Sequence, residues 1–368
     1  MEFDMLHGGD IYGTGEKLGI ACHEVVDFSA NISPLGLPEA VRAAVISELD
    51  NALHYPDVYC RKLRRAIAKR MSADNGTEIV PEMILCGSGA ADIIYRLVFA
   101  MRPKRALIVH PAFVEYEAAL SCVGTEIVSY RLNRNDFLIG EDILPMITED
   151  IDMIFVCNPN NPTGTLTKKE LLLTIAKRAK EAGACLVVDE CFLDFVDSGS
   201  DYTMAGEALN FKNMVLLHSF TKMFAMPGLR LGYAICADKD LLSKLAQYGQ
   251  SWAVSTVAES AGIAALTQPD YERRVRAYVA GERQWLYEKL EALGIAYTKS
   301  YANYILIHVP GEKKLYEKLL TYGIMIRKCE NYVNLDKDYY RIAVNSREKN
   351  RHLISALAKI LNRDILIS

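Results

Sequence analysis

One lysine in this sequence, flanked by two hydroxyl side chains, has a setting that could support covalent chemistry. Lys222 follows Ser219 and Thr221, and Arg230 comes eight residues later. An amine in such a setting can form a Schiff base with an aldehyde cofactor, and a nearby guanidinium can bind the phosphate of that cofactor. The same stretch would also suit a surface loop with a solvated lysine, so other parts of the chain must separate the two interpretations.

Two polar residues elsewhere would suit a flat cofactor ring. Asp189 ends the apolar run 185–188. A carboxylate buried there needs a partner that stabilises its charge, such as a protonated pyridine nitrogen, which turns the ring into an electron sink. Asn161 stands between two prolines, where its amide could donate to a ring oxygen. An acidic loop residue and a structural turn asparagine are the plain alternatives.

A glycine-containing turn and an aromatic residue add to these candidates. The turn 87–91 lies between the apolar run 83–86 and a helical pattern over 93–100, and free N–H groups at a helix start favour an anion. Its spacing matches neither the dinucleotide nor the nucleoside-triphosphate loop motif. Phe113 follows another apolar run and could either stack on a ring or pack in the core.

Anion-binding residues also occur near the two ends of the chain. Arg327 and Arg341 each lie in an apolar, strand-like run, where a planar guanidinium needs a carboxylate, a phosphate or an internal salt bridge. Two such arginines would suit a substrate with more than one negative group. The turn at His7 and Gly8 could bring an imidazole and backbone N–H groups to an anion, or it could be a frayed terminus.

The elements that must position these residues alternate between strands and helices. This rhythm predicts an α/β fold with a mostly parallel sheet covered by helices on both faces. Ligands of such sheets bind beyond the carboxyl ends of the strands, and five predicted strand ends carry the polar motifs. The predicted strands are 83–86, 106–110, 126–130, 153–157, 185–189, 214–218 and 231–235, and the main helices are 113–122, 168–182 and 238–248.

The pattern changes after about residue 250. A long helical stretch over 258–293 is followed by short strands, which predicts a smaller α+β domain. We therefore expect an arm over 1–30, a large domain over 31–249 and a small domain over 250–368. The small domain's predicted strands are 304–309, 324–328 and 339–344, and its closing helices are 312–322 and 349–361.

Composition excludes several classes of function. The 368 residues carry a net charge of −4, so no basic footprint indicates nucleic acid. No apolar run reaches the roughly 18 residues that a membrane span needs, and the acidic N-terminus is unlike a signal peptide. The nine cysteines stand singly and the seven histidines lack metal-ligand spacing, which predicts no metal and a reducing cytoplasm.

Taken together, four motifs resemble the fold-type-I pyridoxal-phosphate enzymes, the aspartate aminotransferase superfamily, over nearly the whole chain. The motifs are NPNNPTG (158–164), DE (189–190), SFTK (219–222) and PGLRLG (227–232). The resemblance implies pyridoxal 5′-phosphate as cofactor. It also implies that Lys222 is the catalytic residue bonded to it, that Asp189 pairs with the ring nitrogen and that Asn161 contacts the ring oxygen.

The resemblance assigns further residues. Arg230 would bind the cofactor phosphate, together with Ser219, Thr221, Gly89, Ala90 and Ala91. Tyr55, in a His-Tyr-Pro-Asp segment, would reach the phosphate of the neighbouring subunit, which implies a homodimer with shared active sites. Arg341 would bind the acidic end of a small substrate.

Two branches of the family fit. The opening HGGD, the segment DFSANISPLG and the stretch 327–332 resemble threonine-phosphate decarboxylases of cobalamin synthesis, in which His7, Gly8 and Asn31 would contact substrate. Phe192 stands where many aminotransferases carry a tyrosine, which leaves Asn161 as the main donor to the ring oxygen. The expected reaction is decarboxylation of O-phospho-L-threonine to (R)-1-aminopropan-2-yl phosphate. The alternative is a histidinol-phosphate aminotransferase that passes the amine to 2-oxoglutarate; the intact lysine, aspartate and arginine argue against a non-enzymatic member.

Overall fold

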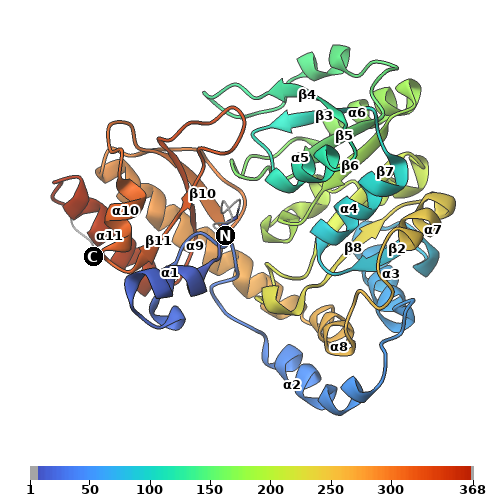
Figure 1. Cartoon of the computed structure of the whole chain (residues 1–368), viewed down its shortest axis with the longest axis horizontal. Helices are drawn as coiled ribbons and strands as arrows, with labels where there is room; N and C mark the ends of the chain where they lie inside the picture. Colours follow the sequence, from blue (N-terminus) through green and yellow to red (C-terminus); the bar gives the residue numbers. More distant parts are fainter. Residues whose placement is uncertain (1–6, 366–368) are drawn as a thin grey trace.

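The computed structural model describes residues 7–365 and is built around a seven-stranded sheet of order β2-β8-β7-β6-β5-β3-β4 (Figure 1). Its strands are β2 (Ile84–Gly87), β3 (Arg105–His110), β4 (Glu126–Arg131), β5 (Met153–Cys157), β6 (Cys185–Asp189), β7 (Met214–Ser219) and β8 (Gly232–Ile235). All neighbouring pairs are parallel except the two made by β8. The predicted mostly parallel α/β sheet is confirmed, and each strand begins and ends within one residue of its predicted bounds.

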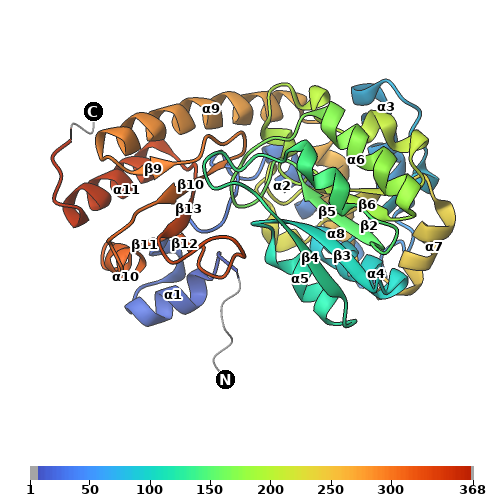
Figure 2. The same ribbon diagram turned by 90° about the horizontal axis from the view of Figure 1, so that it is seen from above.

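Helices cover both faces of this sheet because its central strands are apolar on both sides. Met153 and Phe155 belong to one apolar cluster, whereas Ile154 and Val156 belong to the other, as the two-residue period of a strand requires. Figure 2 shows the helices of each face on opposite sides of the sheet. They are α4 (Ala90–Met101), α5 (Val114–Ser121) and α7 (Lys239–Gln247) on one face, and α3 (Arg61–Asn75) and α6 (Lys169–Ala182) on the other.

A smaller antiparallel sheet of order β12-β13-β10-β9 lies beside the large one (Figures 1 and 2). Its strands are β9 (Ala296–Tyr297), β10 (Tyr304–His308), β12 (Arg327–Lys328) and β13 (Tyr339–Ala343). Helices α9 (Pro269–Ala292), α10 (Leu315–Leu320) and α11 (Arg347–Ile360) accompany it. The smaller α+β unit predicted for the C-terminal third therefore has the expected kinds of elements.

Two predicted elements of this region are interrupted. The helical stretch 258–293 is two helices, α8 (Thr256–Ala265) and α9, because Pro269 has no N–H to continue the first helix and its fixed backbone angle favours the start of a new one. The strand predicted over 324–328 is divided into β11 (Ile324–Met325) and β12, which belong to different sheets. The residue between them, Ile326, is where the chain passes from one pairing partner to the other.

The N-terminal segment, residues 7–33, pairs with strands and packs against helices of the C-terminal third of the chain. Strand β1 (Val26–Asp27) pairs in parallel with β11, and helix α1 (Ile11–Leu18) lies beside α10 (Figure 1). Phe28 donates its N–H to the Met325 carbonyl and accepts from the Ala343 N–H. Residues 1–6 of the predicted arm lie outside the described residues, and the division at 30 and 249 stays a prediction.

The remaining helix, α2 (Glu39–Ser47), packs against α8. Within residues 7–365, every helix is too short or too polar to cross a membrane.

Gly164 marks a tight contact between the large sheet's Asn158–Gly164 loop and the loop before β10. The Gly164 carbonyl accepts from the Tyr301 N–H at 2.8 Å. Its φ is +75°, and a Cβ there would overlap the Ser300 hydroxyl and lie 2.5 Å from the Ser300 Cβ. Gly183, after α6, has a φ of +77° with nothing within 4 Å of such a Cβ, so it offers a matched control.

We expect Gly183→Ala to lower the free energy of unfolding by about 1–2 kcal/mol, the cost of a left-handed backbone for alanine. Gly164→Ala should lower it by roughly 1–3 kcal/mol more, because buried Ser300 must move. Denaturant unfolding of both variants measures the difference. Equal losses would show that the contact between the two loops is loose.

Candidate active site

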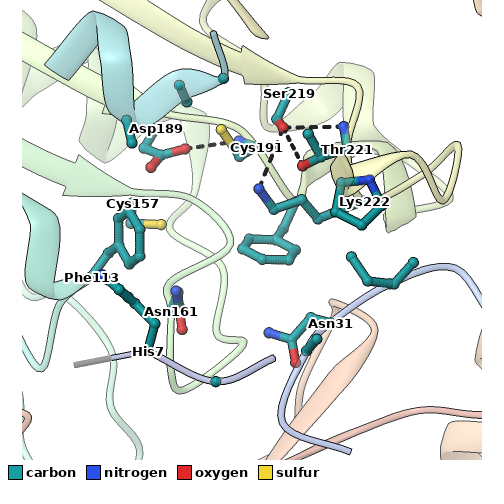
Figure 3. Close-up of a pocket in the computed structure, with 18 of the residues that line it drawn as sticks. His7, Asn31, Phe113, Cys157, Asn161, Asp189, Cys191, Ser219, Thr221 and Lys222 are labelled. Carbon is teal, nitrogen blue, oxygen red and sulfur yellow. Dashed lines mark hydrogen bonds between the residues drawn. The ribbon is translucent and has the colours of Figure 1, made fainter. Parts of the chain in front are cut away.

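The carboxyl ends of β3, β5, β6 and β7 and the turn after β2 meet at one pocket (Figure 3). Most of the predicted site residues line it: His7, Gly8, Asn31, Gly89, Ala90, Ala91, Phe113, Asn161, Asp189, Ser219, Thr221, Lys222, Arg230 and Arg341. Strand β2 shares the direction of β7 because β8 runs antiparallel to both. The structure thus brings all five predicted strand ends to the same edge of the sheet.

Lys222 lies on the tight turn that follows β7. Its Nζ donates to the Ser219 Oγ at 3.4 Å and lies 5.7 Å from the centre of the Phe192 ring. Ser219 and Thr221 bond to each other through their hydroxyls at 2.8 Å. The Lys222 carbonyl accepts from the Ser33 N–H at 2.9 Å, so the lysine backbone is held by a loop of the N-terminal segment while its amine faces the pocket.

Asp189 is a buried carboxylate with two donors and no cationic partner. Its Oδ2 accepts from the Tyr116 hydroxyl at 2.6 Å, and its Oδ1 accepts from the Cys191 N–H at 3.0 Å. None of the ion pairs within the described residues involves Asp189. A buried carboxylate usually needs a counter-charge, so this arrangement fits a ligand that brings a positive charge of its own.

Tyr116 holds this carboxylate rigidly. The phenol is buried and stacks on Phe155 with ring centres 4.7 Å apart. Burial, and after it the charge of Asp189, raises the pKa of Tyr116 well above its usual range. The hydroxyl therefore stays protonated and remains a donor to Asp189.

A cradle for an anion forms where β8 passes the start of α4. Gly89 precedes the helix with a φ of +85°, and no side chain caps its first N–H groups. A Cβ at Gly89 would lie 2.8 Å from Nη2 of Arg230, and one at Gly232 would lie 2.7 Å from the Ala90 nitrogen. Because Gly89 and Gly232 have no side chains, the N-terminus of α4 and the guanidinium of Arg230 border the same space, which suits a phosphate.

Arg341 is the buried cation of the site. Its Nη1 donates to the Asn161 Oδ1 at 2.6 Å and its Nη2 donates to the Ser29 carbonyl at 2.8 Å. When the Asn31 amide is turned so that its oxygen faces the guanidinium, Oδ1 accepts from Nε and Nη1 at 3.2 and 3.3 Å. All these acceptors are neutral, so an internal salt bridge is not what holds this arginine. Its charge is available to a ligand anion.

Two predicted site residues do not line the pocket. Arg327 is buried and is the cross-strand partner of Arg341, so both side chains leave the same face of the small sheet. Its Nη2 donates to the Asn331 Oδ1 at 2.9 Å. Tyr55 is 80% exposed and stacks on Trp252 with ring centres 4.4 Å apart, so within one chain it lies outside the pocket.

Sequence reasoning missed several residues of the site. Tyr116 and Glu115 follow Phe113 in the first turn of α5, and Glu115 accepts a hydrogen bond from the His7 Nε2. The position of α5 directly after a strand end was the signal that could have found them. Tyr116 and Glu115 stand behind the pocket, whereas Ser29, Cys157 and Cys191 line it. Burial is the main cause that raises the pKa of both thiols, so they are neutral.

The fold and this set of side chains define a pyridoxal-phosphate-dependent enzyme with the aminotransferase fold. The chain belongs to the aminotransferase class I and II family, whose model matches residues 23–357. It is 35% identical over 362 residues to the threonine-phosphate decarboxylase of Salmonella typhimurium, covering 98% of this chain and 97% of that protein. The predicted family and its cofactor, pyridoxal 5′-phosphate, are thereby confirmed.

Two solved structures have the same fold. The histidinol-phosphate aminotransferase of Clostridium acetobutylicum superposes with a TM-score of 0.84 and 31% identity, covering 91% of this chain and 99% of that one. The L-threonine-O-3-phosphate decarboxylase of Porphyromonas gingivalis superposes with a TM-score of 0.80 and 26% identity, covering 92% and 100%. Both reactions weighed from the sequence are therefore represented among proteins similar to this chain.

Tyr116→Phe removes the hydroxyl that orients Asp189. We expect the apoenzyme to bind pyridoxal phosphate about 10- to 100-fold more weakly, because a hydrogen bond to a charged group contributes about 1.5–3 kcal/mol. Fluorescence titration of the apoenzyme measures this affinity. Tyr130→Phe is the control, since Tyr130 donates to Asp142 at the same 2.6 Å outside the pocket. Unchanged affinity in Tyr116→Phe would mean that the hydroxyl has no part in holding the cofactor.

Proposed function

We propose that this enzyme decarboxylates O-phospho-L-threonine to (R)-1-aminopropan-2-yl phosphate, as a step of cobalamin biosynthesis. One observation carries the proposal: His7, Gly8 and Asn31 line the same pocket as Lys222 and Arg341. These N-terminal residues are the ones through which the sequence resembles threonine-phosphate decarboxylases. Similarity over the full chain to a threonine-phosphate decarboxylase supports the same choice.

The proposed cofactor contacts follow from the donors that each side chain has left. Asp189 pairs with the ring nitrogen, and Phe113 stacks on the ring. Asn161 uses its Oδ1 for Arg341, which leaves its Nδ2 hydrogens for the ring oxygen. Lys222 forms the covalent link. The phosphate is held by Arg230, Ser219, Thr221 and the turn Gly89, Ala90 and Ala91.

When bound, pyridoxal phosphate supplies an aldehyde that bonds to amines and a protonated ring that accepts electrons from bonds at the attached carbon. The chain's own residues decide which bond of the substrate Cα is aligned with that electron-accepting ring. Arg341, His7 and Asn31 line the pocket and hold the carboxylate and the phosphate of the substrate, so that the Cα–carboxylate bond stands perpendicular to the ring plane. Arg327 lies outside the pocket lining, on the same face of the small sheet as Arg341, and in the proposal it reaches the substrate from there. Binding energy from the remote phosphate fixes this orientation.

Lys222 has a second role in the proposal. After carbon dioxide leaves, the substrate Cα must take up a proton. The Lys222 Nζ lies inside the pocket, bonded to the Ser219 hydroxyl, and an ammonium at this position can donate that proton to Cα.

We also propose a homodimer with shared active sites, working in the cytoplasm. Tyr55 supports the first point, because it is exposed beside Leu53 and Trp252, which are 88% and 47% exposed, and large exposed apolar groups mark interaction surfaces. In the dimer the Tyr55 hydroxyl would reach the partner's cofactor phosphate. The nine free cysteines support a reducing compartment.

The direct test is incubation of the holoenzyme with O-phospho-L-threonine. We expect release of carbon dioxide without formation of a keto acid. The competing result is glutamate formed from histidinol phosphate and 2-oxoglutarate, with no carbon dioxide from phosphothreonine, and it would favour the aminotransferase, whose fold and identity are comparably similar. O-Phosphoserine lacks one methyl group. In a close-fitting pocket this methyl group contributes about 1–3 kcal/mol to the discrimination between the two substrates.

Lys222→Ala should abolish the visible absorption of the bound cofactor. We expect its turnover to fall by about 10³-fold, because both the covalent link and the proton donor are lost. Absorbance spectra and carbon dioxide release measure the two effects. Lys177→Ala, on the exposed part of α6, is the control, and persistence of the absorption band in Lys222→Ala would disprove the role of this lysine.

A further inference from the structure

We propose that Glu115 is a positioning residue that sets His7 to receive the phosphate of the substrate. The proposal rests on the proposed function, because it takes His7 as a ligand of that phosphate. Glu115 is in the first turn of α5, two residues after Phe113. Its carboxylate accepts a hydrogen bond from the His7 Nε2. The two residues are 108 positions apart in the sequence, so only the fold brings them together.

This bond leaves a defined part of the imidazole for the pocket. Because Nε2 donates to Glu115, Nδ1 is the ring nitrogen that remains for a ligand. In the imidazolium form both nitrogens carry a proton, so Nδ1 can then donate to a phosphate oxygen. The ring centre of His7 lies 5.9 Å from that of Phe113, which in turn meets Tyr116 edge to face at 5.7 Å. The imidazole therefore has two neighbours that limit its position, the Glu115 carboxylate and the tilted ring of Phe113.

Glu115 is suited to this role because it stays ionised. The hydrogen bond from His7 is the largest cause that lowers the pKa of Glu115, and the hydroxyl of Tyr95 adds a second bond in the same direction. Burial and its bond to Glu115 raise the pKa of Tyr95 to about 12, so this phenol also remains a donor. The carboxylate side chain is 15% exposed, against 47% for His7, and it forms the fixed half of the pair.

The backbone beside His7 is anchored separately, at Ser29. The Gly9 N–H donates to the Ser29 Oγ at 2.7 Å, and a Cβ at Gly8 would lie 2.5 Å from the Ser29 carbonyl. That carbonyl accepts from Arg341, and Asp27 accepts from the Ser29 hydroxyl at 2.7 Å. The segment is thus tied to the buried arginine, whereas the hydrogen bond to Glu115 fixes which edge of the imidazole faces α5.

The pocket therefore holds two anion-binding side chains, Arg341 and His7, whose positions are fixed relative to each other. Arg341 and His7 are linked through Ser29 and Gly9, and both line the pocket. A substrate with a carboxylate at one end and a phosphate at the other matches such a pair. Glu115 on α5 is in contact with His7. The charged side chains that line the pocket together with His7 are those of Asp189, Lys222, Arg230 and Arg341. An exposed ion pair with no such role would contribute almost nothing to binding.

Glu115→Ala tests the role. We expect the KM for O-phospho-L-threonine to rise about tenfold with kcat within about twofold, because a charge-assisted hydrogen bond that orients a ligand is lost while the cofactor residues are untouched. Glu115→Gln, which can still accept from Nε2, should recover most of the affinity. Glu181→Ala, exposed on α6, is the control. A fall in kcat with KM unchanged would overturn the proposal.

A double-mutant cycle separates positioning from general stability. In a His7→Gln background, Glu115→Ala should not raise KM further, since the group it positions is gone. An equal tenfold rise in both backgrounds would overturn the proposal.

A second measurement needs no substrate and so keeps this inference distinguishable from the proposed function. The carboxyl carbon of Glu115 is followed by nuclear magnetic resonance against pH and identified by its absence in Glu115→Gln. We expect the titration midpoint of Glu115 to rise in His7→Gln. An unchanged midpoint would show that His7 and Glu115 do not interact and would overturn the proposal. If histidinol phosphate proves to be the substrate, the proposed function fails, and the KM comparison is made with that phosphate. Activity on neither substrate overturns the phosphate role of His7 as well.

Discussion

The site depends on two buried opposite charges that the chain does not neutralise itself. Among residues 7–365, Asp189 accepts from a phenol and a backbone N–H and is in no ion pair, and the acceptors of Arg341 are neutral oxygens. Burying a charge without a counter-charge is costly, and here hydrogen bonds from rigid neighbours offset that cost. The consequence is a pocket with one wall that attracts a protonated ring and another that attracts an anion.

Three separate parts of the chain must pack together for this pocket to exist. Asp189 comes from the large sheet, Arg341 from the small sheet, and Ser29 and Asn31 from the N-terminal segment. The parts meet through hydrogen bonds to backbone carbonyls. Tyr304 of β10 donates its hydroxyl to the Asn160 carbonyl at 2.7 Å, and Gly164 receives the loop that carries Ser300. A substrate that touches both sheets therefore meets groups whose spacing is set by the junction.

The same frame serves relatives with different reactions, so the cofactor residues do not decide the chemistry. Lys222, Asp189 and Arg230 suit either a decarboxylase or an aminotransferase. In the function proposed above, the difference lies in the groups that orient the substrate, above all the segment 7–9 and its anchor at Ser29. Phe192, which meets Tyr304 edge to face at 5.0 Å, adds an apolar wall where a hydroxyl would offer another donor. Orientation of one bond relative to the ring then selects the product.

The sequence by itself determined the strands, the sheet and the residues that follow the strand ends, because apolar periodicity and turn residues are local properties. Lys222, Asp189, Asn161 and Arg230 could be named for that reason, and the rule that parallel strand ends converge predicted one pocket. Only the tertiary structure decided that Tyr116 holds Asp189, that Glu115 holds His7 and that β11 and β12 join different sheets. These contacts join segments that are distant in the chain, and no local pattern specifies which side chains meet when helices and sheets pack.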